Sequence, residues 1–373
     1  MDDQNNSREG RPAIFDPHFG AASRVLEDAI AARAFPGCAF GVLAGGKVLL
    51  QNARGRFTYE ENSSAVTSDT VFDLASVSKV LATTAVAMLL CQRGLLDVDQ
   101  KLGDKLPAFL SGRAVDDPAR DVTIRNLLAH NSGLPAYVEF FRTAWTPEEL
   151  VSACMRLPLE TAPGERGEYS DPGFILLGKA LEACMGEPLD VFAQREVFKP
   201  LGMNMTCFCP SHAIRGSIPP TEEDATYRRR RIQGEVQDEN AWLMGGVAGH
   251  AGLFSNVGDV LRFANEIIES TVNDSAIRHL FQANTIEAFE KRQGPADSSR
   301  ALGWDTPSAN SSSGRYFSSR SIGHLGYSGC SLWIDLDARV AVALLTNRTW
   351  PDRKNQLIRQ VRPAFHDAIR QAV

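Results

Sequence analysis

Apolar residues recur along the first part of the chain with two periods, and each period predicts a different kind of element. Helical spacing begins at Asp16-Pro17, where an N-cap residue is followed by proline, and it ends before Pro36. Residues 38–52 then predict a β-hairpin around a Gly45-Gly46 turn. A third short strand is predicted to end near Leu74. The chain therefore opens with a helix, a hairpin and a strand.

The pattern changes after that strand and changes back near the end of the chain. Val77 to Cys91 is predicted to be a long apolar helix that stops at Gly94, because glycine readily adopts the left-handed C-cap conformation. Strand-like runs return at 330–336 and 340–346, separated by a tight turn. The final residues, 357–373, carry apolar side chains at steps of four and predict an amphipathic helix.

Strands at both chain ends with helices between them predict an α/β (α+β) fold. We expect an antiparallel sheet assembled from both ends of the chain, covered by the terminal helices, with an inserted helical region. The sheet part is expected at about 16–75 and 300–373, and the helical part at about 76–299. Residues 1–15 are polar and predict a disordered N-terminal tail.

Composition narrows the range of partners and the cellular setting. The 39 basic and 45 acidic residues give a net charge of −6, which disfavours bulk nucleic-acid binding. Even the four arginines at 228–231 follow three acids at 222–224, so a solvated loop is favoured there. The longest mostly apolar run, 80–91, is too short to span a membrane. The N-terminus has no signal-peptide pattern and the cysteine count is odd, so a cytoplasmic location is predicted, or a periplasmic one if a leader has been trimmed.

The first candidate for chemistry is Ser76, followed by Lys79 three residues later at the start of the apolar helix. This spacing places both side chains on one helix face. A helix N-terminus favours negative charge on the serine oxygen, and a desolvated lysine can accept a proton. The alternative is a helix-capping serine with a surface lysine. No other serine in the chain has a lysine at this spacing.

Two further segments carry polar groups in turn-rich surroundings. Tyr169-Ser170-Asp171 lies in a loop that leads into an apolar helix expected at 175–181, and a tyrosine there can reach a cleft and carry a proton. Residues 323–329, Gly-His-Leu-Gly-Tyr-Ser-Gly, lead into the strand at Cys330. A glycine at 326 would let a substrate approach that strand. A core-edge tyrosine and a plain hairpin turn are the competing interpretations.

Together and in this order, the three motifs resemble the serine β-lactamase and penicillin-binding protein superfamily. They are most similar to the branch that holds class C β-lactamases, D-alanyl-D-alanine carboxypeptidases and family VIII carboxylesterases. Residues 71–76, 130–135, 245–255 and 331–335 also resemble that branch, so the resemblance runs from about residue 17 to the C-terminus.

The resemblance implies a role for each matching residue. Ser76 would be the acylated nucleophile and Lys79 its partner in proton transfer. Tyr169 would be the general base or acid, His324 would orient substrate and tune Tyr169, and the backbone amides of Ser76 and Tyr327 would form the oxyanion hole. The implied reaction is two-step acyl transfer without a metal or other cofactor.

Two positions depart from the family pattern. Asp171 replaces the usual asparagine, which removes an amide donor and, if the carboxylate is ionised near Lys79, favours the charged lysine. His324 replaces the usual lysine of the third motif, and Gly326 is retained. A histidine is largely neutral at pH 7 and therefore supplies no fixed positive charge for a substrate carboxylate.

Other hydrolase classes fit the sequence less well. The chain has no Gly-x-Ser-x-Gly and no His-Glu-x-x-His, and Cys207-Phe208-Cys209 has too short a spacing for a zinc knuckle. The leading expectation is carboxylesterase-like hydrolysis of small esters or amides. The alternatives are β-lactamase or D-alanyl-D-alanine carboxypeptidase activity, and a non-hydrolytic penicillin-binding receptor or scaffold. A small-molecule substrate is expected; the oligomeric state is left open.

Overall fold

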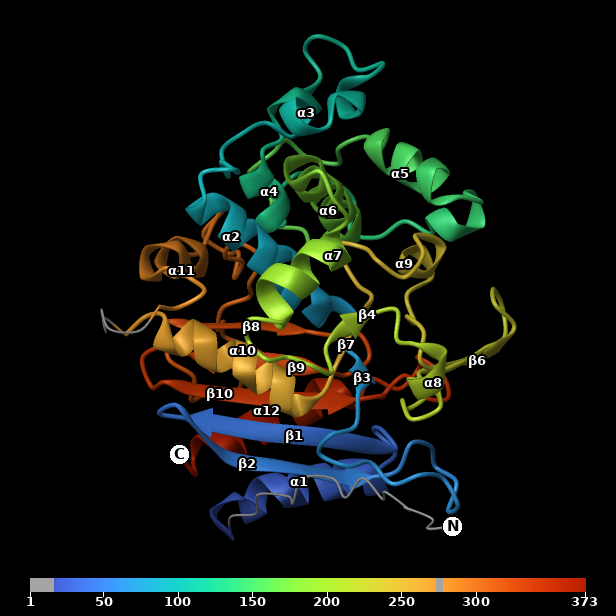
Figure 1. The fold of residues 1–373 in the computed structure, drawn as a ribbon, viewed down its shortest axis with the longest axis vertical. Helices are drawn as coiled ribbons and strands as arrows, with labels where there is room; N and C mark the ends of the chain where they lie inside the picture. Colours follow the sequence, from blue (N-terminus) through green and yellow to red (C-terminus); the bar gives the residue numbers. More distant parts are fainter. Residues whose placement is uncertain (1–16, 273–277) are drawn as a thin grey trace, which may run out of the picture.

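The computed structural model describes residues 17–272 and 278–373, and strands from both ends of the chain form its central antiparallel sheet (Figure 1). The strand order is β2-β1-β10-β9-β8. The strands are β1 (Gly37–Ala44), β2 (Lys47–Gly55), β8 (Ser321–Leu325), β9 (Ser331–Asp335) and β10 (Val340–Thr346). The predicted fold class is confirmed, whereas the predicted tail at 1–15 lies outside the described residues.

Alternation along the strands separates two hydrophobic layers. Val342 and Leu344 of β10 face a cluster that is covered by α1 (Gly20–Ala31) and α12 (Ile358–Arg370). Ala341 and Ala343 face the larger core, which also takes in residues of α10 (Val257–Glu269). This period of two is expected for a sheet that is buried on both faces. The two terminal helices thus cover the sheet, as predicted, and they lie together on one face of it.

The helical region lies on the other side of the sheet and contains most of the remaining elements (Figure 1). Its α-helices are α2 (Ala85–Gln92), α3 (Leu102–Lys105), α4 (Ile124–Leu128), α5 (Pro147–Met155), α6 (Asp171–Met185), α7 (Leu189–Ala193), α8 (His212–Arg215), α9 (Glu239–Leu243) and α11 (Ala283–Glu290). A small sheet of β3 (Phe72–Asp73), β7 (Leu253–Ser255) and β4 (Cys207–Phe208) connects it to the central sheet, and β5 (Glu222–Asp224) pairs with β6 (Arg230–Ile232).

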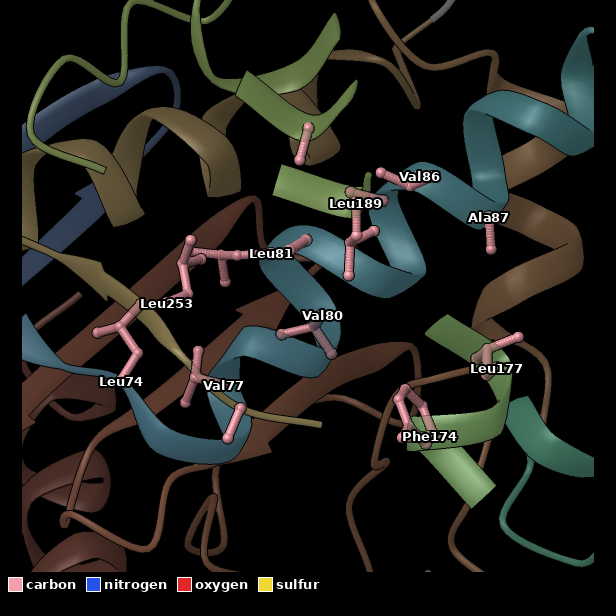
Figure 2. Packing of buried hydrophobic residues seen from close by; sticks show 14 of the residues in the cluster. Leu74, Val77, Val80, Leu81, Val86, Ala87, Phe174, Leu177, Leu189 and Leu253 are labelled. Atoms are coloured by element: carbon pink, nitrogen blue, oxygen red, sulfur yellow. The ribbon is translucent and has the colours of Figure 1, made fainter. Parts of the chain in front are cut away.

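The predicted apolar helix forms the centre of the larger core. It starts with a 3₁₀ turn at Ala75–Val77, continues as a π-helical stretch at Lys79–Thr84 and ends with α2. Figure 2 shows its side chains packed with those of β7, α6 and α7. Ala75–Gln92 spans 18 residues with a mean hydropathy of 1.4, long and apolar enough for a membrane helix, and therefore longer than the run counted from sequence. However, 83% of it is buried inside the protein, as in the core helix of a soluble fold.

Two details differ from the sequence predictions. Residues 321–325 form an edge strand, β8, so the motif at 323–329 includes the end of a strand as well as a turn. The arginines at 228–231 are mostly exposed, as predicted, but the Arg228 side chain is buried. It pairs with Asp224 and donates a hydrogen bond of 2.7 Å to the Val236 carbonyl, because a buried guanidinium must satisfy its donors.

Candidate active site

Ser76 begins the long helix directly after β3, on a turn that Asp73 holds in place. Ala75 has a φ of +47°, a left-handed conformation that is costly for a residue with a Cβ. Asp73 accepts hydrogen bonds from the backbone N–H of Ala75 at 2.8 Å and of Gln237 at 2.7 Å. Burial raises the pKa of Asp73 to about 6, although these two hydrogen bonds oppose the shift. The carboxyl group therefore fixes the strained turn that presents the Ser76 hydroxyl.

Lys79 lies next to Ser76 and is fully buried, with an acceptor for each of its three ammonium hydrogens. Its Nζ donates to Ser76 Oγ at 3.0 Å, to Asp171 Oδ1 at 2.7 Å and to the His250 carbonyl oxygen at 2.9 Å. Burial alone lowers the pKa of Lys79, but the charge of Asp171, helped by Tyr169 and by hydrogen bonds, outweighs it and leaves the pKa raised. Lys79 is therefore an ammonium at neutral pH. It is also buried, so the alternative of a surface lysine is excluded.

Asp171 is the first residue of α6, and its side chain reaches Lys79 from there. The helix starts four residues earlier than the sequence predicts, at 171 instead of 175. Ser170 caps this helix, with its Oγ accepting a hydrogen bond of 3.0 Å from the Gly173 N–H. A carboxylate in the first turn is favoured by the partial positive charge of the helix N-terminus. The substitution of aspartate for the family's asparagine thus creates an ion pair in which Lys79 is fully buried and Asp171 is partly exposed.

Tyr169 stands beside Lys79 at the mouth of the same site. Lys79 Nζ lies 4.8 Å from the centroid of the Tyr169 ring. Burial raises the pKa of the Tyr169 hydroxyl, although the Lys79 charge and hydrogen bonding with Lys79 and Ser76 lower it. The phenol is therefore protonated at neutral pH, and a resting phenolate is disfavoured.

His130 fixes the loop that carries Tyr169. Its Nδ1 accepts a hydrogen bond of 3.0 Å from the Ser170 N–H, and its ring lies 4.4 Å from the ring of Tyr169 and 4.7 Å from that of Phe174. Burial, reinforced by the charges of Arg300 and Lys79, lowers the pKa of His130 well below its usual range. A neutral, acceptor imidazole can therefore hold this backbone amide across the physiological pH range.

The turn after β8 completes the site from the side of the central sheet. His324 is buried, and its Nδ1 donates to the Leu325 carbonyl oxygen at 2.8 Å, because a carbonyl can only accept. Burial and the charges of Lys79 and Arg300 lower its pKa well below the usual range. His324 is thus neutral and presents its Nε2 only as an acceptor, so it cannot donate a hydrogen bond to a substrate carboxylate.

Gly326 is required by the protein's own backbone, because a Cβ at this position would lie 2.3 Å from the Leu74 carbonyl oxygen. It also lines a cavity beside Ser76, and its predicted role in letting a substrate approach stays a prediction. Ser328 adds a hydrogen bond of 2.8 Å from its Oγ to the Asp73 carbonyl oxygen. The turn at 326–330 is thereby locked against the turn that carries Ser76, and the Tyr327 side chain is left half exposed.

Two cavities flank Ser76, and both are also lined by Tyr169 and Tyr327. The first, of about 490 Å³, is basic: its lining includes Arg300, Arg348, Arg359 and Arg362 but only one acid, Asp305. The second, of about 360 Å³, is acidic, with one basic lining residue, Arg353, against four acids, Glu139, Asp171, Asp238 and Glu239. We call them the arginine cavity and the acidic cavity. A substrate carbonyl at Ser76 would therefore have opposite electrostatic surroundings on its two sides.

Comparison with known proteins decides the family. The sequence matches the family Beta-lactamase over residues 22–364, which is nearly the whole chain. The chain belongs to the β-lactamase family. The resemblance read from the three motifs is thereby confirmed, and the protein is a serine hydrolase of this family, which acts on small ester, amide or β-lactam substrates.

Curated relatives of this β-lactamase-family protein carry names of amide-cleaving enzymes. It is 31% identical over 364 residues to the N-acetylmuramyl-L-alanine amidase of Bacillus subtilis (strain 168), covering 87% of this chain and 80% of that protein. It is 28% identical over 351 residues to a protein of Salmonella typhi named as a D-alanyl-D-alanine carboxypeptidase, covering 84% of this chain and 79% of that protein.

Solved structures share the fold over almost the full length. EstCE1, described as a hydrolase with promiscuous acyltransferase activity, has a TM-score of 0.75 and 22% identity, covering 94% of this chain and 98% of that one. A penicillin-binding protein homologue from Caulobacter crescentus has a TM-score of 0.76 and 15% identity, covering 97% and 99%. At these identities the similarity shows the fold alone.

All seven residues singled out from the sequence lie around the same two cavities or contact residues that do. They are Ser76, Lys79, Tyr169, Asp171, His324, Gly326 and Tyr327. Sequence reasoning missed Asp73, His130 and Arg300. Asp73 and His130 lie inside segments that resemble the family, and that was a usable signal. Arg300, whose guanidinium carbon lies 5.1 Å from the Tyr169 ring centroid, comes from a loop with no motif.

Proposed function

We propose that this protein hydrolyses small esters or amides by two-step acyl transfer, in the manner of a carboxylesterase, with Ser76 as the nucleophile. The observation that carries the proposal is the buried ammonium of Lys79, bonded at once to Ser76 Oγ and Asp171 Oδ1. An ammonium in that position stabilises negative charge that develops on the serine oxygen. A protein with no chemistry at Ser76 would have no need for this buried charge.

In the proposed first step, Ser76 Oγ attacks the substrate carbonyl carbon and its proton passes to the Tyr169 oxygen. Because Tyr169 is a phenol at rest, its own proton moves to the leaving alcohol or amine in the same relay, and no free phenolate accumulates. The backbone amides of Ser76 and Tyr327 would hold the oxyanion. In the second step a water molecule attacks the acyl-enzyme, gives its proton to Tyr169, and Ser76 regains a proton from the phenol.

In this mechanism Lys79 keeps its proton throughout and acts by charge, since Asp171 raises its pKa. That role differs from proton transfer by lysine, which the resemblance allows. Asp171 would position Lys79 and keep it charged, and the neutral His324 would orient the substrate from the lining of the arginine cavity. The predicted cytoplasmic location stays a prediction.

The proposal is tested by a fluorophosphonate probe together with p-nitrophenyl butyrate. We expect probe labelling and ester turnover in the native chain, and the loss of both in Ser76→Ala, by at least ~10³-fold for turnover. Labelling without turnover would indicate a receptor that is acylated but not hydrolysed. Neither labelling nor turnover would indicate a scaffold, and either of these results would overturn the proposal.

Amide hydrolysis of a peptide-type substrate is the second candidate function. It is supported by the names of the relatives, an amidase and a carboxypeptidase, and by the four arginines on one side of Ser76, which suit an anionic peptide. Steady-state rates on p-nitrophenyl butyrate, nitrocefin, a D-Ala-D-Ala peptide and N-acetylmuramyl-L-alanyl peptides would rank the candidates. A kcat/KM for a muramyl or D-alanyl peptide above that for the ester would favour the second candidate.

A further inference from the structure

Arg362 of α12 is a buried cation next to the turn at 326–330. Its side chain reaches the turn from the face opposite the helical region, and the residue is only 6% exposed. Nη2 donates to the carbonyl oxygens of Gly326 at 2.6 Å and Cys330 at 2.7 Å, and Nε donates to that of Gly329 at 3.2 Å. Within the described residues, Arg362 forms no ion pair with a carboxylate. Burial lowers its pKa to about 10, so it still carries its charge at neutral pH.

The shortest of these hydrogen bonds, to the Gly326 carbonyl oxygen, ends on the peptide group between Gly326 and Tyr327. The Gly326 carbonyl and the Tyr327 N–H belong to one planar, conjugated peptide unit. Among the described residues the Tyr327 N–H donates no hydrogen bond, and Tyr327 lines both cavities, so this donor is free to bind a substrate oxygen. Under the proposed function, the same N–H is one of the two oxyanion donors.

We infer that Arg362 strengthens the oxyanion hole through this peptide unit. A cation that donates to the carbonyl end of a peptide withdraws electron density and makes the N–H end a stronger donor, because linked hydrogen bonds polarise one another. The Gly329 N–H donates to the same Gly326 oxygen at 3.0 Å and adds to this polarisation. Arg362 is therefore a positioning residue that acts on the transition state without touching the substrate's reacting atoms, and the inference rests on the proposed oxyanion role of Tyr327.

Arg348 provides a matched comparison. It is also buried, at 4% exposure, and it also holds the turn, with its Nε donating 2.7 Å to the Tyr327 carbonyl oxygen. That carbonyl belongs to the next peptide unit, whose N–H is on Ser328. If both arginines only anchored the turn, their removal would have similar effects; if polarisation is the mechanism, the effect on the oxyanion is specific to Arg362.

The test compares Arg362→Gln, Arg362→Lys and Arg348→Gln with the native chain on p-nitrophenyl butyrate. For Arg362→Gln we expect kcat to fall about 10-fold with KM within about 2-fold, a fraction of the loss seen when an oxyanion donor is removed outright. Arg362→Lys, which keeps the charge, should recover most of that loss, and Arg348→Gln should lose less. The affinity for phenylboronic acid, whose tetrahedral adduct on serine carries an oxyanion, should fall in proportion to kcat/KM across the three variants.

A spectroscopic measurement separates polarisation from a structural defect. In an acyl-enzyme labelled with ¹³C at its carbonyl, Arg362→Gln should move the infrared stretch to higher frequency, since a weaker donor polarises the carbonyl less, while Arg348→Gln should not. Equal shifts in both variants, or no shift in a folded Arg362→Gln, would overturn the inference. Failure of the proposed function would instead show in the native chain, as an absence of ester turnover, or in Ser76→Ala, as turnover that survives, so the two failures are distinguishable.

Discussion

Two buried cations lie at the site, Lys79 and Arg362, and different acceptor groups replace the water that each has lost. Each donates three hydrogen bonds. One of the acceptors of Lys79 is a carboxylate, and the pKa of Lys79 is raised; Arg362 has only carbonyl acceptors, and its pKa is lowered to about 10.

The difference separates two uses of charge at one reaction centre. The Lys79 charge is balanced within the site by Asp171 and acts over one hydrogen bond on Ser76 Oγ. The charge of Arg362 is unbalanced and is transmitted along a turn toward the proposed oxyanion. We therefore expect substitutions on the Lys79 side to change proton movements and stability together, whereas those on the arginine side change transition-state binding and substrate charge preference.

Of the substitutions considered, the replacement of Lys79 should have the largest effect on stability and turnover. Lys79→Met leaves the Asp171 carboxylate, whose side chain is 16% exposed, without its partner, and this should lower the unfolding free energy by about 1 to 3 kcal/mol because water solvates part of the remaining charge. Turnover should fall by at least ~10³-fold, since the residues of such a unit act together. Urea unfolding and ester kinetics measure the two effects.

The double variant Lys79→Met/Asp171→Asn is the control for this prediction. It removes both charges, so it should regain most of the lost stability but none of the activity. A double variant as unstable as Lys79→Met would contradict the view that an unpaired carboxylate is the source of the destabilisation.

Tyr169→Phe should have the next largest effect. It keeps the ring contact with His130 but removes the oxygen that would relay the proton, so kcat should fall by ~10²-fold while the thermal midpoint changes little. His130→Asn, which disturbs only the support of the loop, should lower stability more than kcat and serves as the comparison. A Tyr169→Phe enzyme with near-native rates would refute the relay.

Asp171→Asn removes the carboxylate from Lys79, which then has only uncharged acceptors, as Arg362 has in the native chain. Burial then dominates, so the pKa of Lys79 should fall below the native value and the ammonium should lose its proton at lower pH. If the ammonium is the active form, the alkaline limb of kcat/KM moves to lower pH, so the variant should lose more activity at pH 9 than the native chain does. If neutral Lys79 is instead the base, activity rises with pH over the same interval. A pH profile from 6 to 10 distinguishes the two.

The sequence predicted the elements that depend on local patterns. The hairpin around Gly45-Gly46, the helix after Leu74 and the strands on either side of residue 337 follow from period and turn chemistry, and their pairing into one sheet followed from where they lie in the chain. It did not predict the edge strand β8, because Gly323 and Gly326 suggest a turn. Those glycines are required by close contacts, with Trp333 and with the Leu74 carbonyl, which only the folded chain reveals.

The candidate site divides in the same way. Ser76 and Lys79 are linked by helix geometry, so their spacing suffices to place them together. Tyr169 and His324 were connected to them only by resemblance, since no local rule joins segments so far apart in the chain. Arg362 had no signal in the sequence, and the family-like segment around His130 did not reveal its hydrogen bond to the Ser170 N–H, because what matters at both positions is which backbone group a side chain reaches.

Arg300→Gln should give the smallest effect and separates charge preference from catalysis. Arg300 lines the arginine cavity, stands over the Tyr169 ring, and has its nearest ion-pair oxygen, on Asp305, 4.0 Å away, so its donors are available to an anionic group. We expect kcat/KM for mono-p-nitrophenyl succinate to fall roughly 5- to 10-fold, the value of one charge-assisted hydrogen bond partly screened by water, with little change for neutral p-nitrophenyl butyrate. Arg359→Gln, at the exposed rim of the same cavity, should do less. An equal fall for both esters would mean that Arg300 acts on Tyr169 or its neighbours and not on substrate charge.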